Sequence, residues 1–316
     1  MKLFLKKILL ILVLFIGSYC LIFFAVEKGL KNSNYLDFEQ WNNIYNGSIN
    51  SEVIILGSSR AWKQVNPAIL SDKLNLSCYN LGMDGYQIPM QIKRFEIYSN
   101  YNKRPKLVVQ ILDHFSFTKR SNLFNMDQFL PYFDDTSLVS EIKQYEGYSW
   151  PDYYLPYYRY IGSKETALAG FMEFLNIKKF KSLRNNGFLA DDKTWEPYFD
   201  IEKRKNPNGK LIEPIVWIYN SYIQFARQLS SQNISIVLVY APDYYEFQDY
   251  IINHELIRIT YKKLADELGV PFIDYSNHPI CNNKDNFYNP THLNKIGSDL
   301  FSIELADTLA SFMWGN

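Results

Sequence analysis

The sequence is poor in cysteine and has no excess of either charge. Its 316 residues include three cysteines, and the two outside the N-terminal apolar run, Cys78 and Cys281, show no spacing typical of a zinc site or a disulfide framework. A bond between these two is left open. Lys plus Arg equals Asp plus Glu at 33 each, which removes the electrostatic case for nucleic acid as a partner. We therefore expect no metal site, no cofactor and no nucleic acid.

Aromatic residues, by contrast, are abundant. The chain has 25 Tyr, 22 Phe and 6 Trp, a composition that favours a well-packed fold over disorder. Many of them gather in an irregular stretch within residues 115–214, where no steady alternation of strand and helix patterns is found. We interpret this stretch as a partly helical insertion, whose aromatic rings either pack together or stack on sugar rings.

Residues 1–27 are predicted to anchor the chain in a membrane. Three lysines precede an uncharged run from Ile8 to Val26. At about 1.5 Å per residue this run comes close to spanning a hydrocarbon core of about 30 Å. The positive flank predicts a cytoplasmic N-terminus and a main domain outside the cytoplasm. A cleaved signal peptide is the alternative, but Phe23, Phe24 and Val26 supply no Ala-x-Ala-like cleavage site.

After a polar connector, residues 28–50, the pattern becomes that of an α/β domain, residues 51–316. Short runs rich in β-branched residues alternate with helical patterns, which is typical of a parallel sheet with helices on both faces. The insertion interrupts this alternation between the third and fourth strands. The expected strands are 53–56, 77–81, 106–112, 234–240 and 271–275, and the expected helices are 67–74, 86–101, 212–232, 250–268 and 295–313.

One turn in this pattern delivers a serine to the edge of the sheet where ligands of such folds bind. The run Val53–Leu56 ends at Gly57 and two serines, and a helical segment follows. Taken alone, Ser59 is either a helix N-cap or a nucleophile. His292 lies between the last expected strand and the last helix, and loops there return to the same edge of the sheet. The two side chains are therefore expected to meet as a nucleophile and its general base.

Three short blocks resemble those of the SGNH, or GDSL-type, hydrolase superfamily, and the anchor resembles its membrane-bound members that modify cell-surface glycans. The blocks are Gly57-Ser58-Ser59, Asn80-Leu81-Gly82-Met83-Asp84-Gly85 and His292-Leu293-Asn294, in the family's order. The resemblance implies a flavodoxin-like, three-layer α/β/α fold. It also implies that Ser59 is the nucleophile, that the N–H groups of Ser59 and Gly85 form the oxyanion hole, and that His292 is the base.

One departure from the family's pattern concerns the acid of the triad. The position three residues before His292 holds Asn289. Its amide oxygen accepts a hydrogen bond, but it does not stabilise imidazolium as a carboxylate does. Asp285 and Asp243 are alternative acids, although neither has the expected spacing.

The other departure concerns the third block, whose asparagine normally completes the oxyanion hole in the family. This chain reads Asp113-His114-Phe115-Ser116 at that point. Asp113 and His114 are therefore either structural or substrate-binding. Ser58 and Arg60, which flank the nucleophile, are further candidates for substrate contacts.

These observations predict an extracytoplasmic, membrane-anchored serine esterase or O-acyltransferase. By resemblance, its substrate is an acylated, above all acetylated, cell-surface or exported polysaccharide, and its partners include proteins that assemble such polysaccharides. The alternative is a non-catalytic glycan-binding or assembly protein that keeps the fold with a degenerate triad, and Asn289 is the residue that favours it.

Overall fold

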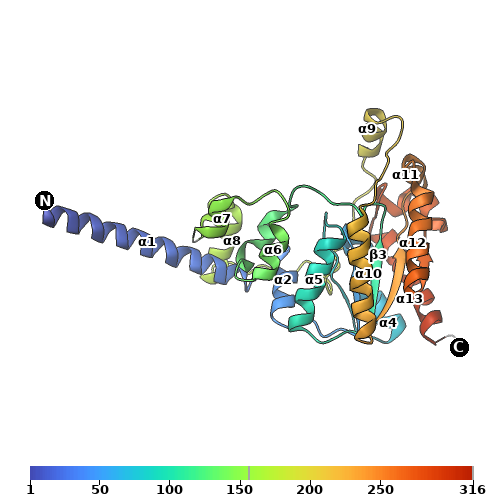
Figure 1. Ribbon diagram of the computed structural model, residues 1–316, viewed down its shortest axis with the longest axis horizontal. Coiled ribbons are helices and arrows are strands. Elements are labelled where there is room, and N and C mark those ends of the chain that lie inside the picture. Colours follow the sequence, from blue (N-terminus) through green and yellow to red (C-terminus); the bar gives the residue numbers. More distant parts are fainter. Residues whose placement is uncertain (156, 315–316) are drawn as a thin grey trace. The chain divides into compact units, whose positions relative to one another are not determined.

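The computed structural model describes residues 1–155 and 157–314 (Figure 1). The chain forms two compact units. The smaller unit combines Met1–Asn46 with Ser121–Leu183, and the larger combines Gly47–Arg120 with Arg184–Asn316. The stretch interpreted as an insertion, residues 115–214, thus contributes to both units.

The larger unit is built on a five-stranded parallel sheet in the order β2-β1-β3-β4-β5. This is the strand order of flavodoxin-like sheets, in which ligands bind beyond the carboxyl ends of the strands. The predicted α/β fold class, with a parallel sheet of about five strands, is confirmed. The strands are β1 Val53–Leu56, β2 Cys78–Asn80, β3 Leu107–Leu112, β4 Ser235–Tyr240 and β5 Phe272–Asp274.

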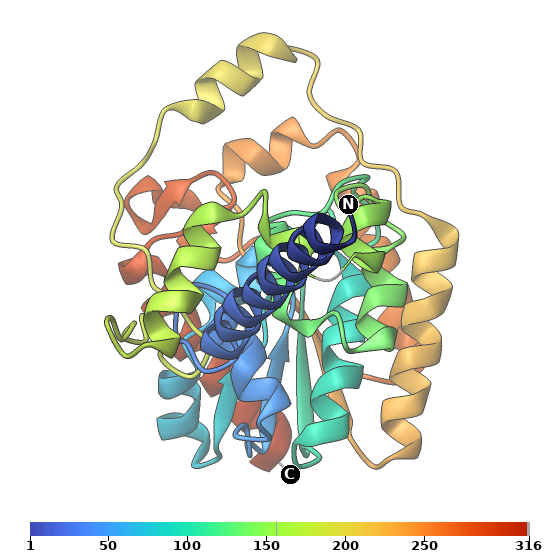
Figure 2. The same cartoon turned by 90° about the vertical axis from the view of Figure 1, so that its left-hand side faces the viewer.

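Helices cover both faces of this sheet and complete the three layers (Figure 2). One face carries α4 Pro67–Leu74 and α13 Lys295–Trp314, and the short helix α3 Ser59–Gln64 contacts α13. The other face carries α5 Ile88–Tyr101, α10 Val216–Ser231 and α12 His254–Leu268.

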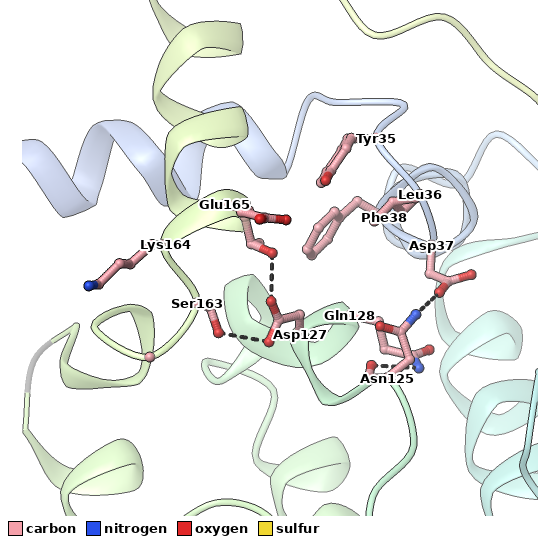
Figure 3. A pocket seen from close by; sticks show the side chains of 12 residues that line it. Tyr35, Leu36, Asp37, Phe38, Asn125, Asp127, Gln128, Ser163, Lys164 and Glu165 are labelled. Atoms are coloured by element: carbon pink, nitrogen blue, oxygen red, sulfur yellow. Dashed lines mark hydrogen bonds between the residues drawn. The ribbon is translucent and has the colours of Figure 1, made fainter.

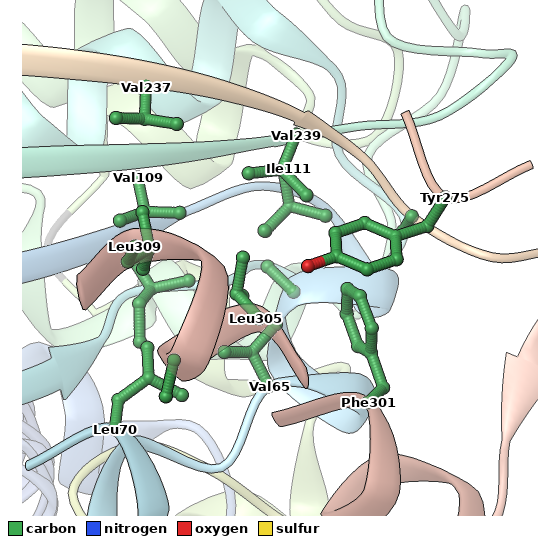
Figure 4. Close-up of a cluster of buried hydrophobic side chains, with 14 of the residues drawn as sticks. Val65, Leu70, Val109, Ile111, Val237, Val239, Tyr275, Phe301, Leu305 and Leu309 are labelled. Carbon is green, nitrogen blue, oxygen red and sulfur yellow. The ribbon is translucent and has the colours of Figure 1, made fainter. Parts of the chain in front are cut away.

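The core beneath α13 shows why these strands and helices assemble (Figure 4). Successive strand residues point to opposite faces, so one alternate set on β3 and β4 forms a continuous apolar surface. Side chains one turn apart on α13 pack against it, and burying each contributes about 1.5–3 kcal/mol. The facing residues are Val109, Ile111, Val237 and Val239 on the strands, and Phe301, Leu305 and Leu309 on the helix.

The connections that follow β3, β4 and β5 hold shorter elements. They include α9 Tyr198–Lys205, α11 Tyr245–Tyr250 and the 3-10 helices Pro279–Asn282 and Lys284–Asn286. The strands β6 Phe287–Asn289 and β7 His292–Leu293 pair antiparallel outside the main sheet. This small hairpin carries the histidine and the asparagine that the sequence singled out.

The smaller unit is helical and rich in aromatic contacts. Its elements are α1 Lys2–Leu30, α2 Phe38–Tyr45, α6 Thr136–Ile142, α7 Trp150–Tyr154, α8 Lys164–Phe174 and the 3-10 helices Met126–Tyr132 and Tyr158–Tyr160. Trp41 is fully buried, and its ring lies 5.8 Å from that of Phe129 and 6.0 Å from that of Tyr132. Backbones of α1 and α8 touch, since a Cβ on Gly29 would lie 1.8 Å from the carbonyl oxygen of Gly170.

By length and composition, α1 is able to cross a membrane, and it is the one such helix within residues 1–155 and 157–314. Its most apolar window of 18 residues has a mean hydropathy of 2.9 and is 6% buried. The apolar N-terminal helix predicted from the sequence is therefore present. Near its end, Ala25, Val26, Gly29 and Leu30 are buried in the smaller unit.

Both cysteines outside α1 are free thiols, so no disulfide joins Cys78 to Cys281. Each side chain is buried in the larger unit. Burial raises the pKa of Cys78 to about 11 and that of Cys281 to about 12. Such thiols react slowly, because the thiolate is the reactive form.

Candidate active site

The turn after β1 exposes the hydroxyl of Ser59. Gly57 has a φ of +153°, and a Cβ there would lie 2.7 Å from the Cβ of Ala61, so only glycine fits. The N-cap of α3 is Ser58, whose Oγ accepts a hydrogen bond from the Arg60 N–H at 3.3 Å. The alternative interpretation of Ser59 as the N-cap is therefore wrong. Ser59 is the first residue of α3, and its hydroxyl is left for another partner.

That partner is His292, at the start of β7. Its Nε2 lies 2.7 Å from Ser59 Oγ, and its Nδ1 lies 3.0 Å from Oδ1 of Asn289 at the end of β6. The Thr291 hydroxyl lies 2.9 Å from the same Nδ1. The structure thus brings together Ser59, His292 and Asn289, which are separated by up to 233 residues in the sequence.

Hydrogen bonds from Thr291 to Asn289 determine which tautomer His292 adopts. Its N–H donates to Asn289 Oδ1 at 3.0 Å, and its hydroxyl donates to the same oxygen at 3.2 Å. An amide NH₂ group cannot accept these bonds, so the Asn289 oxygen must face His292. His292 Nδ1 therefore carries the proton and donates it, which leaves Nε2 with the lone pair needed to accept the Ser59 hydroxyl proton.

The surroundings make His292 a weak base. Burial lowers its pKa to about 3, helped by the positive charge of Arg60 and opposed by the negative charge of Asp243. At neutral pH the ring is therefore uncharged, as a general base must be before reaction. The same low pKa makes the imidazolium costly to form, and Asn289 brings no negative charge to offset that cost.

The second block supplies a loop that lies near Ser59 through Gly85. Asn80 ties this loop to α3, because its Nδ2 donates to the carbonyl oxygens of Ala61 and Val65 at 2.7 and 2.8 Å and its Oδ1 accepts the Gly82 N–H at 2.9 Å. Sequence reasoning did not identify this role of Asn80. A buried asparagine directly after a strand was the available signal.

Two residues beside the same cavity, Ser59 and Gly85, have backbone N–H groups with no acceptor among the residues that the structure describes. Gly85, with a φ of +70°, uses its carbonyl oxygen to accept Arg120 Nη1 at 2.8 Å. Neither its N–H nor that of Ser59 donates a hydrogen bond to any residue described in the structure. Backbone N–H groups without an acceptor are able to donate to a ligand oxygen, so such a pair is suited to holding an oxyanion.

Asp243 is committed to a buried ion pair with Arg60 and does not contact His292 in the described structure. The Arg60 guanidinium lies 2.7 Å from the Asp243 carboxylate and donates to the carbonyl oxygens of Ala241 and Pro242 at 3.0 and 2.7 Å. Both charged side chains are buried, so the pair holds the loop after β4 against α3. Asp285, the other alternative acid, is exposed, and its own bonds are made through its backbone.

The loop after β3 places two more candidates at the site. Ser58 Oγ donates to Asp113 Oδ2 at 2.5 Å, and Asp113 Oδ1 accepts the Phe115 N–H at 2.7 Å. His114 is 2% exposed, and neither of its ring nitrogens hydrogen-bonds to any residue that the structure describes. Its Nδ1 lies 3.7 Å from Asp243 Oδ2. His114 is thus a buried polar ring with unused hydrogen-bonding capacity.

A cavity of about 240 Å³ joins these groups. It is smaller than the roughly 300–1,000 Å³ typical of pockets for drug-sized ligands. The sequence candidates line it directly, except Asn289 and the two alternative acids, Asp243 and Asp285. The lining residues are Ser58, Ser59, Arg60, Gly85, Tyr86, Gln87, Asp113, His114, Phe115, Ser116, Arg120, Thr291 and His292.

A second cavity, of about 430 Å³, lies within the smaller unit (Figure 3). Two of its acidic side chains are already paired: Asp127 accepts hydrogen bonds from Ser163 at 2.7 Å and Thr166 at 2.6 Å, and Asp37 accepts one from Asn125. No group of three His, Cys, Asp or Glu side chains able to hold a metal ion occurs in the part of the chain that the structure describes. Of these two cavities, the one beside Ser59 has the assembled set of reactive groups.

Sheet order, block positions and the serine–histidine contact together define an α/β unit with the fold of SGNH/GDSL-type hydrolases. No family model matches the chain, and no curated protein does. Solved structures similar to it include a GDSL-like lipase from Bacteroides thetaiotaomicron, 11% identical with a TM-score of 0.37 over 82% of this chain and 86% of that chain. Another is a G-D-S-L family protein from Desulfitobacterium hafniense, 12% identical with a TM-score of 0.39 over 82% of this chain and 99% of that chain.

Proposed function

We propose that the larger unit is a serine esterase or O-acyltransferase that acts on acetyl or similar O-acyl groups of cell-surface or exported polysaccharide. The observation that carries this proposal is the continuous hydrogen-bond chain from Ser59 through His292 to Asn289, with distances of 2.7 and 3.0 Å. The cavity of about 240 Å³ beside Ser59 supports a small acyl group. The polysaccharide acceptor rests on the resemblance to membrane-bound glycan-modifying relatives.

In the proposed reaction, Ser59 Oγ attacks the ester carbonyl carbon while His292 Nε2 takes the hydroxyl proton. The carbonyl oxygen becomes an oxyanion, held by the N–H groups of Ser59 and Gly85. His292 then gives its proton to the departing alcohol oxygen, and the acyl group stays on Ser59. Water or a sugar hydroxyl attacks this acyl group next, giving hydrolysis or transfer, and the proton passes back through His292 to Ser59.

Among the candidates for substrate contacts, the geometry favours His114. Ser58 and Asp113 already bond to each other, and Arg60 is paired with Asp243. These three side chains shape and hold the cavity wall. His114 lines the cavity with no hydrogen-bond partner among the described residues, so it is free to contact the acyl or sugar part of a substrate.

For location, we propose that α1 crosses the membrane once with its N-terminus in the cytoplasm. The lysines at positions 2, 6 and 7 support this orientation by the positive-inside rule. The main domain then lies outside, where polysaccharide and its assembly proteins are available as partners. Alkaline phosphatase fused to the C-terminus tests the orientation, because it is active only outside the cytoplasm; an inactive, stable fusion contradicts it.

Hydrolysis by the full chain in lipid nanodiscs tests the chemistry. We expect p-nitrophenyl acetate to be cleaved, with activity falling as the acyl chain lengthens to octanoate. Ser59→Ala should abolish both hydrolysis and labelling by a fluorophosphonate. Ser231→Ala, an exposed position at the end of α10, is the matched control and should keep both. Equal hydrolysis by Ser59→Ala and the control would refute the mechanism.

The second candidate function is a non-catalytic glycan-binding or assembly protein with the same fold. The observation that favours it is the low basicity of His292, whose pKa is about 3, beside an uncharged Asn289. In that case the wild type would not react with the fluorophosphonate, yet acetylated polysaccharide would bind with equal affinity to wild type and Ser59→Ala. Labelling at Ser59 in the wild type decides for the enzyme.

A further inference from the structure

We propose that the smaller unit seats an aromatic patch in the lipid headgroup layer of the membrane that α1 crosses. The patch consists of five exposed side chains on and after α7: Trp150, Tyr154, Leu155, Tyr158 and Ile161. Their exposed fractions are 64, 59, 42, 39 and 49%, large for apolar and aromatic groups in a folded unit. The inference rests on the proposed membrane insertion of α1 and is independent of the chemistry at Ser59.

Contacts within the smaller unit fix the level of the 3-10 helix Tyr158–Tyr160 along α1, and α7 packs against this 3-10 helix. Rings of Tyr157 and Tyr160 stack on Phe23 of α1 at 6.2 and 5.8 Å. One turn further along, Glu27 forms an ion pair with Arg159 at 2.7 Å and accepts the Tyr160 hydroxyl at 3.3 Å. The 3-10 helix after α7 is thus attached where the apolar run of α1 gives way to charge.

That level corresponds to the membrane surface. Phe23 and Glu27 are four residues apart, or about 6 Å along a helix. The headgroup layer on each side of a bilayer is about 5–7 Å thick. This is half the difference between the total thickness of the bilayer and the thickness of its hydrocarbon core. Elements attached between Phe23 and Glu27 therefore lie at headgroup depth when α1 spans the bilayer.

The chemistry of the patch fits this position. Trp and Tyr concentrate at membrane interfaces, because one part of each ring system is apolar and the other forms hydrogen bonds. Lys143 adds a cation beside the patch, with its Nζ 4.8 Å from the ring centre of Tyr153 and 5.0 Å from that of Tyr154. Anionic lipid headgroups attract such a cation. We therefore infer that the surface of the bilayer around α1 is what covers the patch.

Site-specific fluorescence in the full chain tests the inference. Cys20 is changed to serine, and Cys78 and Cys281 stay unlabelled because both thiols are buried. Trp150→Cys carries a small fluorophore, and Thr136→Cys, exposed at the start of α6, is the matched control. Thr136 is two residues from Asp134, which pairs with Lys31 beyond the end of α1. Vesicles of phosphatidylethanolamine and phosphatidylglycerol contain a lipid with a spin label on its headgroup.

We expect the headgroup spin label to quench the fluorophore at position 150 more strongly than the one at 136, and aqueous iodide to do the reverse. Strong iodide quenching at 150 without lipid quenching would overturn the inference. Shielding of position 150 from both quenchers would also overturn it, by showing that a protein partner or a second copy covers the patch. Resistance to alkaline carbonate extraction reports insertion of α1 separately, so failure of the anchor and failure of the patch are distinguishable.

Discussion

Replacing Asn289 with aspartate should strengthen the base at the site without disturbing its structure. The two residues have nearly the same shape, and the oxygen that faces His292 already accepts bonds from the Thr291 N–H and hydroxyl at 3.0 and 3.2 Å. A carboxylate there would find the same donors and add a negative charge beside His292 Nδ1. Asn289→Asp is therefore expected to fold normally and to raise the pKa of His292.

The expected size follows from the spacing. Two unit charges about 4 Å apart interact by about 4 kcal/mol at an effective dielectric constant of about 20, equivalent to about three pKa units. The pKa of His292, about 3 in the natural chain, should approach its ordinary value. Because general-base catalysis as a whole contributes about 10²- to 10⁴-fold, we expect kcat/KM for acetyl esters to rise by roughly ten- to a hundredfold.

The measurement is kcat/KM against pH for the wild type and Asn289→Asp. Activity requires neutral His292, so it is lost as the pH falls through the pKa of that residue, and the acid limb should move to higher pH in the variant. Asn283→Asp makes the same change at an exposed residue of the same loop and should leave the profile unchanged. An unmoved acid limb and an unchanged rate in Asn289→Asp, with Ser59→Ala inactive, would refute the role given to Asn289.

Three further outcomes can be measured. The free energy of unfolding should fall as the pH drops from about 6.5 towards 3. The loss is about 1.4 kcal/mol per pH unit for each proton that binds to the unfolded chain but not to the folded chain. In urea titrations at several pH values, His292→Gln should make the free energy of unfolding less dependent on pH, because the pKa of His292 is lowered in the folded state. Asp243→Asn leaves Arg60 buried without its counter-charge and should lower the free energy of unfolding in urea by about 3–5 kcal/mol. The double variant Asp243→Asn, Arg60→Met should recover much of this loss. Gly57→Ala should lower the free energy of unfolding by about 1–3 kcal/mol and reduce ester cleavage, because the φ of +153° at Gly57 and the crowding by Ala61 both exclude a Cβ. Thermal unfolding at the wild-type temperature would contradict this.

The sheet could be predicted from the sequence because buried parallel strands have a simple pattern. The residues of β1 and β3 are wholly buried, and their sequences are nearly continuous apolar runs. Their predicted bounds agree with Val53–Leu56 and Leu107–Leu112 within one residue. Helix ends were less predictable. The helix expected over 250–268 begins at His254, and a separate helix, Tyr245–Tyr250, precedes it.

The internal arrangement of the site could not be predicted in the same way. Arg60 pairs with Asp243, 183 residues later, and no local pattern in the sequence indicates that pairing. Likewise, the capping role of Ser58 rather than Ser59 depends on the backbone at Gly57. The order of the blocks nevertheless predicted which side chains converge, because strand order fixes which loops share an edge.

Asn289 separates two tasks that a single carboxylate performs in most serine–histidine sites. One task is to hold the histidine in the tautomer whose Nε2 accepts a proton, and here Thr291 ensures it by orienting the amide oxygen. The other is to stabilise the imidazolium, which an amide does not do. The loss of about four powers of ten on acid-to-amide replacement in a serine protease arises largely from the wrong tautomer. Since Thr291 prevents that error, the uncharged Asn289 is compatible with a slow but genuine serine nucleophile.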